Sequence, residues 1–150
     1  KIRNKLENIQ DKPKSSYVHG NSTLENILIN PLTLDICFID LYDETYFNSP
    51  VSDYSQILQC SKYFYGLKMR EPKIENKINS LFNFKLVKGP DNLILFNKIF
   101  EKLIFHEMIS EHLISLMCAS QFTRLLPFRI QSGDLYNAKY FFSLADYILS

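Results

Sequence analysis

The hydrophobic positions follow a helical spacing over most of the chain. Near the start, Ile2, Leu6 and Ile9 predict a short amphipathic helix over 1–12, which Pro13 would end. Farther along, apolar residues recur at the same spacing in four longer segments. These segments predict helices over 51–65, 91–105, 107–125 and 134–149.

Capping residues and prolines mark the ends of these four predicted helices. Ser49 or Ser52 can cap the first of them, and Pro50 suits its first turn. Asp91 follows a Gly-Pro break and can cap the second. Pro127 is expected to end the third, because a proline inside a helix removes a backbone hydrogen bond.

One region has the pattern of strands. Residues 27–30 are a short β-branched run, 30–33 form a turn, and 35–40 are a second short strand, so we predict a hairpin. An isolated two-stranded hairpin is marginally stable and must pack on the helices. The fold class is therefore mainly α with a short β-hairpin (α+β), in one domain over 1–150. Residues 66–90 show no clear pattern.

Composition excludes several classes of protein. A chain of 150 residues with 46% hydrophobic residues can form one core. A net charge of +1 gives no basic field for nucleic acid, and no apolar run is long enough to span a membrane. Without a signal peptide, a cytoplasmic location is expected. The chain starts at Lys1, not at a methionine, which favours a piece of a longer protein.

Two further sets of residues carry weaker signals. Cys37, Cys60 and Cys118 are widely spaced with no C-x-x-C pair, so we expect three buried, reduced thiols and no zinc site. Four basic residues from Lys68 to Lys77 form a loose cluster. A solvated face is the expectation for them, with contact to an anionic substrate as the alternative.

The segment most informative about function is HGNSTLENILINPLTLDICFID, residues 19–40. Asn21 and Asn26 lie on one loop before the first predicted strand, and Asp40 ends the second. A hairpin brings those two ends together and gathers oxygen ligands at its edge. Such ligands suit Mg²⁺, which takes few protein groups and fills its shell with phosphate and water.

The spacing of these residues resembles a known family. The chain reads HGN-x-x-x-x-N at 19–26, ID at 39–40 and S-P-x-x-D at 49–53. This combination resembles the aminoglycoside phosphotransferase and choline kinase group, which has the protein-kinase-like fold. The variant T-L-E-N-I-L is most similar to phosphotransferases of bacterial capsule and surface-sugar biosynthesis. The resemblance covers 17–65 well and is weaker at the Leu-Leu-Pro-Phe-Arg stretch, 125–129.

The resemblance implies the C-terminal lobe of such a fold. Residues 1–12 would be its last helix before the catalytic loop, 17–40 the loop and hairpin, and 51–150 the helical body. The family transfers phosphate from ATP, with Mg²⁺, to a hydroxyl of a small-molecule substrate. Its smaller lobe supplies a Gly-rich loop and a Lys for the phosphates. Too few residues precede Tyr17 to form that N-terminal lobe, so it is expected elsewhere in the same polypeptide or in a fused domain.

The resemblance also implies a role for individual residues. Asn26 and Asp40 match the metal ligands, and Asp40 would bridge Mg²⁺ to the nucleotide phosphates. His19 matches a loop histidine that is mainly structural. Asp53 matches an aspartate that braces the catalytic loop through backbone amides.

Asn21 departs from the family, which has a catalytic aspartate at this position. An amide can orient a substrate hydroxyl but is not a useful base, and a general base is typically worth about 10²–10⁴-fold. Three explanations stay open: a natural pseudoenzyme, a deliberate inactivating substitution, or an enzyme that works without this base. The loose transition state of phosphoryl transfer is compatible with the third.

Other functions remain as alternatives to an active phosphotransferase. The chain can be a catalytically impaired pseudokinase, or a binding module that keeps the fold. A helical interaction domain unrelated to kinases is a third alternative, in which the asparagines only cap turns beside a hairpin.

Overall fold

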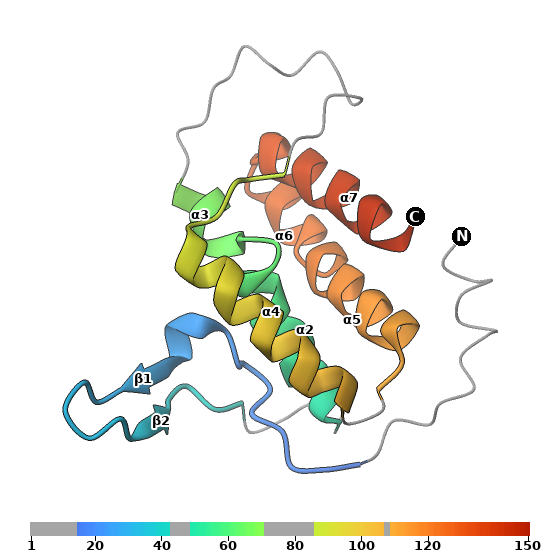
Figure 1. The fold of residues 1–150 in the computed structure, drawn as a ribbon. Helices are drawn as coiled ribbons and strands as arrows, with labels where there is room; N and C mark the ends of the chain where they lie inside the picture. The colour runs from blue at the N-terminus through green and yellow to red at the C-terminus, as the bar shows by residue number, and fades with distance from the viewer. Residues whose placement is uncertain (1–14, 43–48, 71–85, 107–108) are drawn as a thin grey trace.

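The computed structural model describes residues 15–42, 49–70, 86–106 and 109–150. The helix predicted over 1–12 lies outside these ranges. The described chain is mainly helical, with one two-stranded antiparallel hairpin, as the sequence predicted (Figure 1). Its helices are α2 (Pro50–Ser61), α3 (Tyr65–Arg70), α4 (Asp91–His106), α5 (Glu111–Thr123), α6 (Leu126–Gln131) and α7 (Leu135–Leu149). None of the helices in these ranges combines the length and apolar character needed to cross a membrane.

The core lies where α5 packs between α2 and α7. Phe122 of α5 and Phe141 of α7 are fully buried, with their ring centroids 5.7 Å apart. Tyr63, just after α2, packs edge-on against Phe122 at 5.8 Å. Aromatic pairs at such distances contribute beyond the area that they bury, so these rings join three segments into one core.

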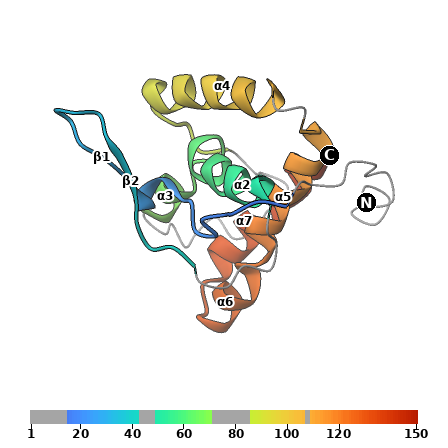
Figure 2. The ribbon, with the colours of Figure 1, turned by 90° about the horizontal axis from the view of Figure 1, so that it is seen from below.

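The hairpin consists of β1 (Ile27–Ile29) and β2 (Ile36–Phe38), preceded by the 3₁₀ turn η1 (Leu24–Asn26). Ile27 lies opposite Phe38, and Ile29 opposite Ile36. The connecting turn is closed by Asn30, whose backbone N–H donates to the Asp35 carbonyl at 2.9 Å. Figure 1 and Figure 2 both show the hairpin reaching away from the helices, so its two faces are largely exposed.

The helix predicted over 51–65 is shorter than expected. It begins as predicted, with Pro50 in its first turn and the Ser49 hydroxyl accepting a hydrogen bond from the backbone N–H of Val51 at 3.4 Å. It ends at Ser61, and Phe64 then has a φ of 53°. A right-handed helix cannot continue through a left-handed residue, so α3 starts anew after it.

Three predicted helix boundaries farther along the chain are also wrong. The helix expected over 107–125 begins only at Glu111 in α5, because the Ser110 hydroxyl accepts the backbone N–H of Leu113 at 3.2 Å and caps it there. Pro127 does not end this helix but lies in the first turn of α6. At that position the missing N–H has no helical partner to lose. Asp91 is the first residue of α4 instead of its cap.

Polar side chains are buried along α2 in the middle of the bundle. Ser55 and Ser61 are fully buried. Gln121 of α5 donates to the Ser55 hydroxyl at 3.0 Å, and Ser61 donates to the side-chain oxygen of Asn97 on α4 at 3.2 Å. Hydrogen bonds therefore join α2 to both neighbouring helices, which offsets the loss of water around these groups.

The cysteines differ from the expectation of three buried thiols. Cys60 and Cys118 are buried, and desolvation raises the pKa of both thiols to about 12. Cys37 is exposed on β2, in a hairpin that reaches away from the described helices.

Lys68 is buried in α3 and does not lie on a solvated face. Its ammonium lies 4.7 Å from the ring centroid of Tyr136 and 4.5 Å from that of Tyr140, and it donates to the Tyr136 hydroxyl at 3.1 Å. Aromatic faces attract a cation and replace part of its hydration, which allows this lysine to be buried. The predicted cluster extends to Lys73 and Lys77, which lie outside the described residues.

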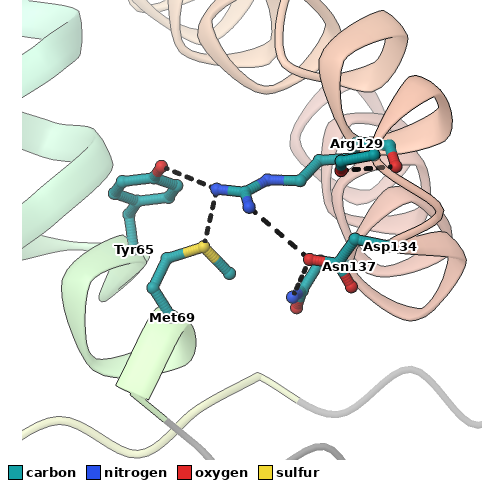
Figure 3. Close-up of polar contacts among 6 residues, drawn as sticks. Tyr65, Met69, Arg129, Asp134 and Asn137 are labelled. Carbon is teal, nitrogen blue, oxygen red and sulfur yellow. Dashed lines mark hydrogen bonds and ion pairs between the residues drawn. The ribbon is translucent and has the colours of Figure 1, made fainter.

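Arg129 connects α3 to the junction of α6 and α7 (Figure 3). Its guanidinium donates to the Tyr65 hydroxyl at 3.4 Å and contacts the Met69 sulfur at 3.0 Å. On the other side it forms an ion pair with Asp134 at 3.5 Å, and Asn137 donates to the same carboxylate oxygen at 2.8 Å. The planar guanidinium reaches several partners at once, so one side chain holds three helices in place.

Candidate functional site

The structure brings Asn21, Asn26 and Asp40 together at the base of the hairpin. The side-chain amide of Asn21 donates to the carboxylate Oδ2 of Asp40 at 2.5 Å and lies 3.4 Å from the Asp40 backbone carbonyl. The side-chain amide of Asn26 donates to the backbone carbonyl of Asn21 at 2.7 Å. We call these three residues the polar cluster. The sequence pattern predicted that the two ends of the hairpin would bring these residues together.

Backbone pairing beyond the strands explains why the cluster forms. The N–H of Ile39 donates to the Asn26 carbonyl at 3.0 Å, which extends the hairpin by one residue pair. The N–H of Tyr42 donates to the His19 carbonyl at 3.1 Å and holds the outgoing chain against the incoming loop. Between these contacts Asp40 has a φ of 58°. This left-handed turn redirects the chain where the carboxylate meets Asn21.

Asp53 holds the loop that carries Asn21. Its two carboxylate oxygens accept the backbone N–H groups of His19 at 2.7 Å and of Gly20 at 2.9 Å. Gly20 has a φ of 76°, a conformation that a side chain would strain, which explains a glycine at this position. Ser22 adds a hydrogen bond from its hydroxyl to the Asp53 carbonyl at 2.9 Å. The first turn of α2 is therefore fixed to both sides of the loop.

Gln56 is a supporting residue that the sequence reasoning missed. It lies one helical turn after Asp53, is 1% exposed, and donates from its side-chain amide to the Gly20 carbonyl at 2.8 Å. Asp53 thus binds the N–H of Gly20 while Gln56 binds the carbonyl. The signal for Gln56 was its spacing, since residues three apart share a helix face.

His19 connects the loop to the hairpin. Its Nδ1 accepts the backbone N–H of Asn21 at 3.3 Å, and its ring centroid lies 5.6 Å from that of Phe38 on β2. Its Nε2 is buried, with no hydrogen-bond partner among the described residues. These contacts orient the loop relative to the hairpin.

The donor set of the cluster is of the kind that Mg²⁺ binds together with phosphate and water. The amide nitrogen of Asn26 is bound, and its Oδ1 has no hydrogen-bond donor in the described part of the chain. One carboxylate oxygen of Asp40 accepts from Asn21, which leaves the other for an ion. Mg²⁺ commonly takes one or two protein oxygens and completes its shell with phosphate and water. Within the described ranges no group of three His, Cys, Asp or Glu residues could hold a metal by itself.

An exposed apolar surface adjoins the cluster. Leu28 of β1 follows Asn26 by two residues and is 50% exposed. Ile29, Ile36 and Phe38 are exposed on the opposite face. The hairpin thus offers oxygen ligands and an apolar platform within one short segment.

The polar cluster and its motif are the observations that bear on ancestry. They come from residues 17–65, and the helices after them share no motif of comparable specificity with the family. When the chain is compared with protein-family models, with curated proteins and with solved structures, none of them matches it. Membership of the kinase-like group therefore remains a prediction drawn from this chain's own residues.

Proposed function

We propose that this chain is the C-terminal lobe of an ATP- and Mg²⁺-dependent phosphotransferase with the protein-kinase-like fold. Its acceptor would be a hydroxyl of a small metabolite, of the kind used in surface polysaccharide synthesis. The observation that carries the proposal is the polar cluster, in which Asn21, Asn26 and Asp40 are joined by hydrogen bonds at the base of the hairpin. A cytoplasmic location, where ATP is present, belongs to the same proposal.

Each residue of the site has a part in this proposal. Asn26 and Asp40 would hold Mg²⁺, which when bound neutralises charge on the phosphates and on the group in transfer. Leu28, half exposed on β1, would support the flat, apolar part of the nucleotide. Asp53 and Gln56 keep the loop in position, and positioning supplies most of the rate in phosphoryl transfer. A second lobe would supply the cationic and Gly-rich contacts to ATP.

Asn21 is the basis of a second candidate, a pseudokinase or binding module that keeps the fold without turnover. Its amide donates to Asp40, which is the one carboxylate of the cluster and is assigned to Mg²⁺ in this proposal. A neutral amide can orient a substrate hydroxyl but cannot remove its proton. Slow or absent transfer is the consequence that separates this candidate from the first.

Calorimetry on the full-length protein with Mg-ATP tests the proposal. Asp40→Ala and Asn26→Ala should each weaken Mg-ATP binding by about tenfold or more, because each removes an oxygen ligand of the ion. Asp35→Ala is the matched control, since this exposed aspartate lies at the far end of the same hairpin and should leave binding unchanged. No binding by the unchanged protein would refute the nucleotide site.

Turnover then separates the two candidates. An Asn21→Asp variant should raise phosphate transfer to a hydroxyl acceptor by about 10²-fold or more if the unchanged protein is an enzyme that lacks its base. Binding of Mg-ATP without transfer in either form would favour the binding module.

A further inference from the structure

We propose that Asn21 holds the carboxylate of Asp40 and thereby keeps the affinity of the site for free divalent cations low. The cation then enters together with the phosphates of its ligand. This inference rests on the site of the proposed function and concerns its regulation, but its test needs neither nucleotide nor turnover.

The contact between Asn21 and Asp40 occupies one of the two oxygens that a cation would use. The side-chain nitrogen of Asn21 lies 2.5 Å from Oδ2 of Asp40, with a second, longer approach of 3.4 Å to the backbone carbonyl of the same residue. The amide N–H therefore provides at Oδ2 the partial positive charge that a cation would otherwise provide. A metal that took both carboxylate oxygens would have to displace it.

Both sides of this contact are fixed by other bonds. The backbone N–H of Asn21 donates to His19, and its carbonyl accepts from Asn26. Asp40 lies in a left-handed conformation between two cross-chain backbone bonds. These bonds fix the backbones of both residues at positions from which their exposed side chains reach each other, so only the side-chain torsions remain to be set for the hydrogen bond to form.

Charge acts in the same direction as the hydrogen bond. Asn21 and Asn26 are neutral, so Asp40 is the only charged member of the polar cluster. Affinity for a free divalent cation rises with the number of carboxylates that face it. Phosphate groups bring negative charge with them, and a nucleotide would therefore supply what the cluster lacks.

Two substitutions at one position separate the effect of the hydrogen bond from that of charge. Asn21→Ala removes the donor and frees Oδ2 without adding charge, so the affinity for free cation should rise by about threefold. Asn21→Asp has nearly the same shape but places a second carboxylate against Asp40. In the absence of cation the two carboxylates repel, and with cation they share it, so the affinity should rise by about tenfold or more.

Titration of the full chain with Mn²⁺, followed by the loss of the free-ion paramagnetic resonance signal, measures these affinities without nucleotide. We expect the order Asn21→Asp, Asn21→Ala, unchanged protein, and Asp40→Asn as the weakest. The inference is overturned if Asn21→Ala binds Mn²⁺ no more tightly than the unchanged protein, or if Asn21→Asp does not exceed Asn21→Ala.

Thermal unfolding provides the second readout. In a chelator, Asn21→Asp should unfold at a lower temperature than Asn21→Ala, and Mn²⁺ should raise its midpoint more than that of any other form. Equal midpoint shifts for all forms would count against the inference. Failure of Mg-ATP binding would refute the proposed function alone, because the ranking for bare Mn²⁺ is decided independently.

Discussion

Removal of the Asp53 carboxylate should detach the loop that carries the polar cluster. In Asp53→Ala, the backbone N–H groups of His19 and Gly20 lose acceptors at 2.7 and 2.9 Å. A hydrogen bond to a charged group contributes about 1.5–3 kcal/mol, and water recovers part of this at a half-buried position. We therefore expect the free energy of unfolding to fall by about 3 kcal/mol.

Urea unfolding followed by circular dichroism measures this loss, and hydrogen exchange locates it. The amides of His19 and Gly20 should exchange faster in Asp53→Ala, because the acceptors that protect them are gone. Asp35→Ala is the control: this exposed carboxylate accepts from Thr33 in the hairpin turn and should change stability by less than about 0.5 kcal/mol. A loss below about 1 kcal/mol for Asp53→Ala, or unchanged exchange at the two amides, would show that Asp53 does not hold the loop in place.

Three further predictions concern the rest of the chain. Gly89→Ala should lower the free energy of unfolding in urea by about 2 kcal/mol, because the added Cβ would overlap the ring of Phe64, and an unchanged value would contradict this packing. At pH 8 an alkylating reagent should modify Cys37 and leave Cys60 and Cys118 unmodified, since burial raises the pKa of these two thiols to about 12 and keeps them protonated. Mass spectrometry that finds Cys60 or Cys118 modified in the native protein would disprove their burial. Arg129→Met should lower the calorimetric unfolding temperature by several degrees through loss of a largely buried ion pair. Arg124→Ala, at an exposed arginine, should not lower it, and equal shifts for the two variants would argue against the cross-helix contacts of Figure 3.

The hairpin and the polar cluster were predictable because their determinants are local. Turn residues and β-branched runs fix the two strands, and a hairpin necessarily brings its ends together. The presence of Asn21, Asn26 and Asp40 at one edge follows from that geometry alone. The amide of Asn21 bound to the carboxylate of Asp40 did not follow, because it depends on the side-chain angles of two residues on different segments.

Features that depend on tertiary packing were not predictable from spacing. Apolar periodicity continues through Phe64, yet its left-handed backbone divides one expected helix into two, and its ring lies against Gly89, 25 residues farther along the chain. Lys68 has the composition of a surface residue and is buried because two tyrosines from α7 surround its ammonium. In each case a partner far away in sequence overrides the local preference.

The buried polar residues of α2 have a consequence for how the site is located within the molecule. Ser55 and Ser61 bind particular partners on α5 and α4, and a helix moved along its axis by one residue, about 1.5 Å, would lose both. Apolar side chains tolerate such a slide more readily than directional bonds do. Asp53 and Gln56, which hold the loop, belong to the same helix. The hydrogen bonds of Ser55 and Ser61 therefore fix the position of the loop along the axis of α2 relative to α4 and α5. A substitution deep among the helices, at Gln121 for example, is thus expected to displace Asn21 without touching it.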